Sequence, residues 1–205
     1  MATVGVIVLG YFLGSVSFGA VLGRLKGVDV RRYGSGRTGV TNVLRTLGGK
    51  VAAAVFIGDL AKGVGAVLLA RYLVGSDVAQ VGAGLAALAG HNWPVFLGFR
   101  GGRGVTTGLG GLLALSWPVA LMGLGVWLAI IALTRYVSLG SVLGSVVVGA
   151  GLVGWSLAGW APIPYIAYGL GAAALIVFQH RDNISRLLAG TERKLGQPAE
   201  MRTEP

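Results

Sequence analysis

The chain has 205 residues, of which 54% are hydrophobic and 12% charged, and its formal net charge is +10. Soluble domains carry roughly 25% charged residues, and a soluble domain of this length could not bury so much apolar surface. The composition therefore excludes an ordinary soluble protein and predicts an integral membrane protein. The sequence has no cysteine, which excludes a disulfide, a thiolate nucleophile and a cysteine metal site.

Apolar stretches divide the chain into seven predicted membrane-spanning helices, since each span takes about 20 residues. The fourth and fifth are divided at Trp117-Pro118 because proline interrupts a helix. No basic residue precedes the first stretch, so we interpret it as a retained span rather than a signal peptide. Residues 1–195 form one predicted all-α polytopic domain, and 196–205 form a polar, flexible tail. The predicted spans are residues 3–23, 51–71, 77–97, 105–117, 118–134, 138–157 and 163–180.

Basic residues predict how these spans are oriented. With seven spans, the segments 24–50, 98–104, 135–137 and 181–205 share one side of the membrane and hold 15 of the 17 lysines and arginines. Cytoplasmic loops are enriched in lysine and arginine. We therefore expect that side to be cytoplasmic, with the amino terminus outside and the carboxyl terminus inside.

The first polar cluster, residues 31–45, combines tight-turning glycines with neutral and positively charged donors, an inventory that suits a phosphate. A helix that begins near Thr38 would place Thr38, Thr41 and Arg45 on one face. No Gly-Lys-Ser/Thr follows, so this is not a Walker A loop. The alternative is a basic loop that orients the protein and touches anionic lipid. The candidate ligands are Gly34, Ser35, Gly36, Arg37, Thr38, Thr41, Asn42 and Arg45.

The second cluster, residues 90–108, places glycines and arginines just before a new apolar helix, which predicts a second anion site. A flexible turn with snorkelling arginines is the alternative. His91 by itself is more typical of a buried polar residue than of a catalyst. The candidate ligands are His91, Gly101, Gly102, Arg103 and Gly104.

The third cluster, residues 179–194, follows the last predicted span. If that helix continues past the membrane, His180, Asn183 and Leu187 share a face, and an imidazole and an amide could meet the other two clusters. Inside the second span, Asp59 and Lys62 are three residues apart. We interpret them first as a structural pair, because an unpaired charge in the membrane is costly.

Several catalytic patterns are missing from the sequence: HExxH, a cluster of metal ligands, a GxSxG elbow and paired cytoplasmic carboxylates. We therefore expect no metal and no cofactor. A site of hydroxyls, amides, arginines and histidines fits the handling of phosphorylated or acyl-phosphorylated molecules. A transporter of phosphorylated metabolites is the rival hypothesis, although it would need a site at the midplane and repeated halves. A scaffold protein would not account for the ordered motifs.

These motifs resemble one known family. Gly-Ser-Gly-Arg-Thr-Gly-Val-Thr-Asn at 34–42, Gly-His-Asn-Trp-Pro at 90–94, Gly-Gly-Arg-Gly at 101–104, and His180 with Asn183 are similar to the bacterial acyl-phosphate:glycerol-3-phosphate acyltransferases, the PlsY family. The resemblance runs from about residue 14 to 194. Arg37 and Arg103 depart from it, since the family usually has asparagine and lysine there; both keep or add donors and positive charge.

The resemblance implies transfer of a fatty acyl group from acyl phosphate to the 1-hydroxyl of sn-glycerol 3-phosphate. The products would be 1-acyl-sn-glycerol 3-phosphate (lysophosphatidate) and inorganic phosphate, in the first acylation step of bacterial phospholipid synthesis. It further implies seven helices in the bacterial inner (cell) membrane, with the site on the cytoplasmic side in contact with membrane lipid. No nucleic acid and no obligate protein partner are expected.

The resemblance also suggests roles for individual residues. Ser35, His180 and Asn183 would be catalytic, and Glu192 would be a structural tie between the tail and the basic loops. Either His180 or a substrate phosphate oxygen would accept the hydroxyl proton. Substrate or phosphate would be bound by Gly34, Gly36, Arg37, Thr38, Thr41, Asn42, Arg45, Lys62, His91, Gly101, Gly102, Arg103 and Gly104.

Overall fold

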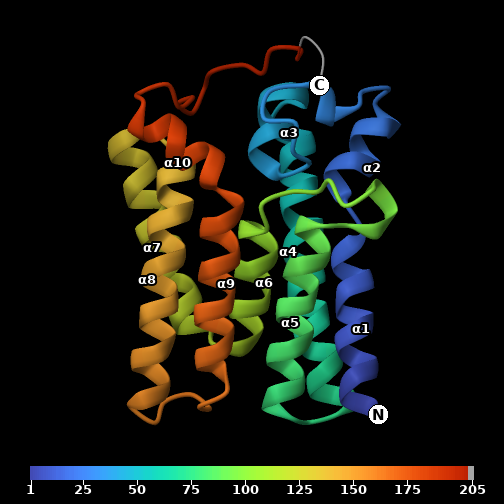
Figure 1. Ribbon diagram of the computed structural model, residues 1–205, viewed down its shortest axis with the longest axis vertical. Coiled ribbons are helices and arrows are strands. Elements are labelled where there is room, and N and C mark those ends of the chain that lie inside the picture. The colour runs from blue at the N-terminus through green and yellow to red at the C-terminus, as the bar shows by residue number, and fades with distance from the viewer. Residues whose placement is uncertain (203–205) are drawn as a thin grey trace.

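A computed structural model describes residues 1–202 and shows a bundle of helices (Figure 1), which confirms the all-α prediction. The part of the chain that it describes contains no strand, only an isolated antiparallel bridge between Tyr33 and Met201. The elements are α1 Ala2–Ser15, α2 Phe18–Leu25, η1 Val30–Arg32, α3 Val40–Leu47, α4 Gly49–Leu73, α5 Asp77–Asn92, η2 Val95–Leu97, α6 Val105–Leu115, α7 Trp117–Thr134, α8 Val137–Leu157, α9 Tyr165–Gln179 and α10 Arg181–Leu188.

Within residues 1–202, four helical stretches are long and apolar enough to cross a membrane: Ala2–Leu25, Gly49–Leu73, Trp117–Thr134 and Val137–Leu157. α6 and α9 are shorter apolar helices, and α5 has 16 residues. At a rise of about 1.5 Å per residue, the 11 residues of α6 cover about half of a hydrocarbon core that is roughly 30 Å thick. The chain is thus a multi-pass membrane protein, and seven full crossings stay a prediction.

Several helix ends differ from the predicted ones. The first predicted span is not one helix, because Val16 and Ser17 are extended between α1 and α2. α5 ends at Asn92 rather than at residue 97, since Pro94 disfavours helix just before it. The fourth and fifth predicted spans are separate helices, divided at Ser116, one residue before the predicted division.

Glycines allow neighbouring helices to approach closely. A Cβ atom at Gly14 of α1 would collide with the backbone of Ala87 in α5, and one at Gly63 of α4 would collide with the Thr107 carbonyl group of α6. Small residues at such interfaces are typical of membrane bundles. The largest buried apolar cluster lies among α5, α6, α7, α8 and α9 and includes Leu88, Leu112, Val119, Leu152 and Tyr168.

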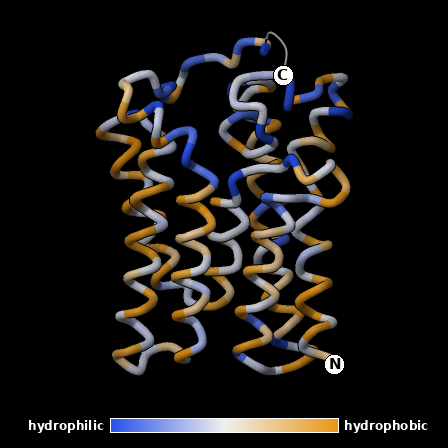
Figure 2. The backbone as a smooth tube through the Cα atoms, in the orientation of Figure 1, coloured by the Kyte–Doolittle hydropathy of each residue, from blue (hydrophilic) through white to orange (hydrophobic). Residues whose placement is uncertain are grey.

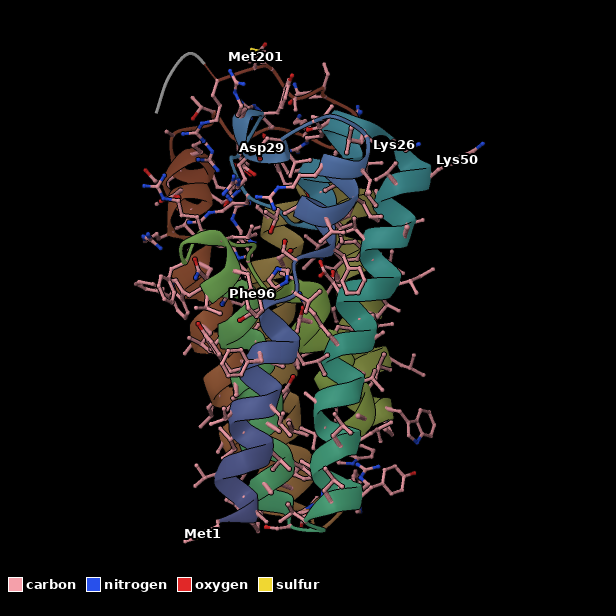
Figure 3. The ribbon with its side chains drawn as sticks, turned by 90° about the vertical axis from the view of Figure 1, so that its right-hand side faces the viewer. Met1, Lys26, Asp29, Lys50, Phe96 and Met201 are labelled. Carbon is pink, nitrogen blue, oxygen red and sulfur yellow. The ribbon has the colours of Figure 1, made fainter. Side chains whose placement is uncertain are left out.

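Polar segments gather at one end of the bundle. Figure 2 shows hydrophilic residues concentrated at the end that holds the last described residues, above predominantly hydrophobic helices. In Figure 3, Lys26, Asp29 and Lys50 lie toward this polar end, Met1 lies at the opposite end, and Phe96 lies between them. The segment around Phe96 therefore lies nearer the middle of the bundle's long axis than the loop around Asp29 does.

Candidate active site

One cavity brings together residues from all three polar clusters. Its volume is about 360 Å³, which falls in the range of small-molecule sites. The cavity lies where α3, α6 and α9 begin or end, so backbone groups at helix termini are near it. Its polar lining includes Ser35, Arg37, Thr41, Asn42, Arg45, His91, Arg103, Gly104, His180, Asn183 and Glu192.

Asn42 holds the first loop in shape from its place in the first turn of α3. Its amide nitrogen donates to the carbonyl oxygens of Val30, Tyr33 and Arg37 at 2.9, 3.1 and 2.9 Å. Its Oδ1 accepts from the Ser35 N–H at 3.1 Å. The amide group of Asn42 is therefore used within the protein, and its effect on the cavity is to place Ser35.

The glycines of this loop turn the chain. Gly34 and Gly36 have φ values of +54° and +69°, which glycine adopts without steric cost. Their N–H groups donate to the carbonyl oxygens of Glu200 and Tyr33, both at 2.9 Å. These amides are bonded within the protein, so the structure does not present them to a phosphate as the sequence analysis expected.

The predicted helix after this loop begins later than expected. α3 starts at Val40, so Thr38 lies outside it. Thr38 is 1% exposed, and its carbonyl group packs against Gly19 of α2. Thr41 lines the cavity, whereas Thr38 does not.

Arg37 and Arg45 of the first cluster line the cavity, and their guanidinium groups have few hydrogen-bond acceptors within the described protein. Arg45 Nη2 donates to the carbonyl oxygens of Arg193 and Lys194 at 3.1 and 3.3 Å. Arg45 Nε is buried and has no hydrogen-bond partner within residues 1–202. Burial lowers the pKa of Arg45 and that of Arg37 below the usual arginine value. Burial thus destabilises both charges, and a bound anion would compensate them.

The second loop uses two of its amides to fold back on α5. Gly101 N–H donates to the Asn92 carbonyl oxygen at 3.2 Å, and Gly102 N–H donates to that of His91 at 3.1 Å. The cavity is lined instead by Gly104 and by the first residues of α6, Val105 and Thr106. N–H groups in the first turn of a helix have no helical partner and favour an anion. The amide donors available to an anion are therefore those at the start of α6, and not those of Gly101 and Gly102.

Arg103 links this loop to the end of α9. Its Nε donates to the Gln179 carbonyl oxygen at 3.3 Å. Burial, followed by the nearby charges of Arg37 and Arg186, lowers the pKa of Arg103 to about 10. The guanidinium group still carries its charge at neutral pH. The cavity thus holds a surplus of positive charge, which attracts anions.

His180 stands between α9 and α10, which are separate helices, so the condition of one continuous helix past residue 180 is not met. Its Nδ1 lies 2.8 Å from the Ile176 carbonyl oxygen. Because a carbonyl oxygen only accepts, Nδ1 carries the hydrogen and Nε2 of the neutral ring is left as an acceptor. His180 can therefore accept a proton at Nε2.

Glu192 ties α10 to α8. Its carboxylate accepts from Ser138 Oγ at 2.7 Å, Asn183 Nδ2 at 2.6 Å and Arg186 Nε at 2.7 Å. Burial by itself would raise the pKa of Glu192, but these hydrogen bonds outweigh burial and the pKa is lowered. Asn183 Oδ1 is buried and finds no donor in the described chain, so it is available to a ligand hydroxyl.

The predicted pair inside the second span is present and has a third member. Lys62 Nζ lies 2.9 Å from Asp59 Oδ1 and 2.8 Å from His91 Nδ1. It also donates to the Val16 carbonyl oxygen at 2.9 Å. Lys62 does not line the cavity, whereas Asp59 and His91 do. The ammonium group thus hydrogen-bonds to Val16 and His91 and forms an ion pair with Asp59, so a phosphate contact from Lys62 finds no support in this geometry.

The rest of the cavity lining is mainly apolar, and the sequence did not predict these residues. They come from α6, α7, α8 and α9 and look like any other residues of an apolar span. One signal was available, since Ser138, Ser141 and Ser145 recur on one helical face of α8. This part of the lining includes Leu109, Leu112, Leu124, Trp127, Leu128, Ile131, Val148, Ala172 and Ile176.

Fold and site together define a multi-pass membrane protein with an anion-attracting cavity that extends between its helices. The chain belongs to the glycerol-3-phosphate acyltransferase family, the PlsY family. The model of this family, described as "Glycerol-3-phosphate acyltransferase", matches residues 4–190. It is therefore a membrane acyltransferase.

Named relatives and solved structures agree with this assignment. The glycerol-3-phosphate acyltransferase of Synechococcus sp. (strain CC9902) is 48% identical over 192 residues, which cover 93% of this chain and 94% of that protein. That of Gloeobacter violaceus (strain ATCC 29082 / PCC 7421) is 47% identical over 200 residues, or 95% and 96% of the two chains. The crystal structure of PlsY (YgiH), an integral membrane glycerol 3-phosphate acyltransferase, in its glycerol 3-phosphate form has a TM-score of 0.89 at 41% identity, with 96% of both chains covered. Its lysophosphatidic acid form has a TM-score of 0.87 at 40% identity, also with 96% of both chains covered.

Proposed function

We propose that the protein transfers a fatty acyl group from acyl phosphate to the 1-hydroxyl of sn-glycerol 3-phosphate, giving 1-acyl-sn-glycerol 3-phosphate and inorganic phosphate. The observation that carries this proposal is a cavity whose arginine-lined polar end continues into an apolar part between α6, α7, α8 and α9. Both substrates carry phosphate and one carries a fatty chain. A cavity of this composition suits the pair.

In this proposal, the polar end binds the two phosphate groups. Arg37, Arg45 and Arg103 supply positive charge, and the first turn of α6 supplies N–H donors. Arg103 and the first turn of α6 bind the phosphate of glycerol 3-phosphate. The acyl chain lies along the apolar lining.

The reaction needs a positioned hydroxyl more than a strong base, because phosphate is a good leaving group from the mixed anhydride. The 1-hydroxyl oxygen attacks the acyl carbonyl carbon, the bond from that carbon to the phosphate oxygen breaks, and inorganic phosphate leaves. His180 Nε2 accepts the hydroxyl proton. Asn183 Oδ1 and the Ser35 hydroxyl orient the substrates, which lowers the barrier by proximity.

The same proposal places the site on the cytoplasmic side of the bacterial inner membrane. The polar end of the bundle carries the basic segments 24–50, 98–104 and 181–202 (Figure 2). The preference of basic loops for the cytoplasm supports this orientation. The amino terminus would then face outward.

Purified protein tests the acyl donor directly. It should acylate glycerol 3-phosphate with palmitoyl phosphate, release inorganic phosphate and retain its activity in EDTA. Palmitoyl-CoA in place of palmitoyl phosphate should give no comparable turnover. Equal turnover with both donors would overturn the proposed donor and leave the family assignment intact.

A further inference from the structure

Asp59, Lys62 and His91 form a buried charged cluster that the proposed reaction does not use. The three residues are 1%, 3% and 4% exposed. Lys62 Nζ contacts both of the others, at 2.9 and 2.8 Å, and His91 Nδ1 lies 3.6 Å from Asp59 Oδ1. The cluster lies inside the bundle, on α4 and α5.

Stability is a poor explanation for this cluster. Removing two charges from water costs several kcal/mol per ion, and apolar residues of similar volume are often as stabilising as a buried ion pair. Charged groups inside a membrane protein are expensive for the same reason. A buried ion pair does, however, fix the relative positions of the elements that hold it.

The cluster connects three parts of the chain. From α4, Lys62 Nζ reaches the Val16 carbonyl oxygen at the break between α1 and α2. On α5, the His91 ring lies directly against the glycine-rich loop, since a Cβ atom at Gly102 would overlap His91 Nε2. The Gly102 N–H also donates to the His91 carbonyl oxygen at 3.1 Å. Lys62 therefore holds the ring on which Gly102 rests.

The orientation of the ring follows from the hydrogen bond. An ammonium group only donates, so His91 Nδ1 accepts from Lys62 Nζ and the neutral ring carries its hydrogen on Nε2. The Asp59 carboxylate holds the ammonium group in place from the same helix. Arg103 follows Gly102 directly, so a shift of the ring would move the phosphate-binding segment.

The geometry points to Asp59, Lys62 and His91 as positioning residues that hold loop 98–104 so that Arg103 and the first turn of α6 meet the phosphate of glycerol 3-phosphate. This inference rests on the proposed function, in which that segment binds phosphate. The three residues act through the loop and do not touch the reacting atoms.

Removal of both charges separates a positioning role from a stabilising one. Lys62→Met should lower the melting temperature, because Asp59 is left buried and unpaired. The double variant Asp59→Asn/Lys62→Met should melt close to the wild type and still show a KM for glycerol 3-phosphate raised about tenfold, with kcat changed less than about threefold. A double variant that recovers both the melting temperature and the wild-type KM would overturn the inference.

Arg71→Met is the matched control. Arg71 lies in the last turn of α4, where its Nε donates to Gln80 Oε1 at 3.0 Å. This contact between two polar side chains lies at the end of the bundle opposite to the polar end (Figure 1). This variant should lower the melting temperature with an unchanged KM for glycerol 3-phosphate. An equal rise of KM in Arg71→Met would show that any loss of stability raises KM, and the positioning role would fail.

A milder substitution tests the contact between the ring and the loop. Gly102→Ala adds only a methyl group, which should collide with His91 and raise the KM for glycerol 3-phosphate. The double variant Gly102→Ala/His91→Asn has a shorter side chain at position 91, so its KM should equal that of His91→Asn alone. A wild-type KM in Gly102→Ala would mean that the loop does not rest on the ring.

Failure of the acyl-donor proposal would be seen separately. The variants are compared with the wild type on palmitoyl phosphate, or on palmitoyl-CoA if the wild type turns over only that donor. If the wild-type protein is inactive with palmitoyl phosphate, the proposal that acyl phosphate is the donor is wrong. Unchanged KM values in the variants refute the positioning role.

Discussion

Arg45 Nη2 donates to the carbonyl oxygen of Arg193 at 3.1 Å, although the two residues are 148 positions apart in the chain. The segment after α10 crosses the polar end of the bundle toward α3 (Figure 1), and its carbonyl groups hold one edge of the guanidinium group. The buried Nε of Arg45 remains available inside the cavity. The carboxyl-terminal segment thus orients a residue that we assign to phosphate binding.

Arg45→Lys should impair the enzyme nearly as much as Arg45→Ala. A guanidinium fork can bond the tail carbonyl groups and a phosphate together, whereas an ammonium group is a point charge. We expect KM for a phosphate-bearing substrate to rise at least about tenfold in both variants, equivalent to about 1.4 kcal/mol. Steady-state kinetics in detergent measure this, and a neutral Arg45→Lys would show that charge alone suffices.

Arg103, unlike Arg45, should tolerate replacement by lysine. Within residues 1–202 its one hydrogen bond is from Nε to the Gln179 carbonyl oxygen, and the family that the motifs resemble usually has lysine here. Arg103→Ala should mainly raise the KM for glycerol 3-phosphate, and Arg103→Lys should be close to neutral. A strong loss in Arg103→Lys would indicate bidentate binding of the phosphate at this position.

His180→Ala should mainly lower kcat. Because Nδ1 bonds to the Ile176 carbonyl oxygen, Nε2 of the neutral ring is the acceptor for the hydroxyl proton, and this contact strengthens in the transition state. A loss of about one hundredfold, or roughly 2.7 kcal/mol, is ordinary for such a group. Full turnover in a folded His180→Ala variant would make a substrate phosphate oxygen the proton acceptor.

Glu192 should make stability depend on pH. Its folded-state pKa lies below the ordinary value of 4.5, so the ionised carboxylate stabilises the fold above about pH 4.5, and this contribution is lost as the pH falls through the folded-state pKa. Glu192→Gln should therefore melt below the wild type at pH 7, and the difference should shrink in acid. Melting curves in detergent measure this. Asp182→Asn, at a half-exposed residue of α10, should follow the wild-type profile; a pH-independent difference for Glu192→Gln would contradict the assignment.

Topology can be mapped with single cysteines, because the chain has none of its own. Cysteines at the exposed residues Lys50, Arg100 and Thr191 should react with an impermeant thiol reagent only from the cytoplasm. Cysteines at Ser76 and Ala158 should react only from outside. Labelling of positions 50 and 100 from opposite sides would separate the two loops that the proposed site unites.

Sequence patterns predicted helices best where apolar runs are long. The runs that became α4, α7 and α8 are close to the expected spans. The break at Val16 and Ser17 was not predicted; there the Val16 carbonyl oxygen accepts a hydrogen bond from Lys62 on another helix. The flexibility of the tail stays a prediction; in its described part, Arg202 N–H donates to the Arg32 carbonyl oxygen at 2.9 Å. Residues 203–205 of that tail lie outside the described residues.

The sequence alone determined the membrane class, the family and the types of residue at the site, because composition, periodicity and motif spacing are local properties of the chain. Tertiary structure decided which groups remain available to a ligand. The amides of Gly34, Gly101 and Gly102 and the ammonium group of Lys62 find partners within the protein, whereas Arg45 Nε and Asn183 Oδ1 do not within residues 1–202. Hydrogen-bond capacity is used up by neighbours that are distant in sequence, so only the packed helices show what is left for a substrate.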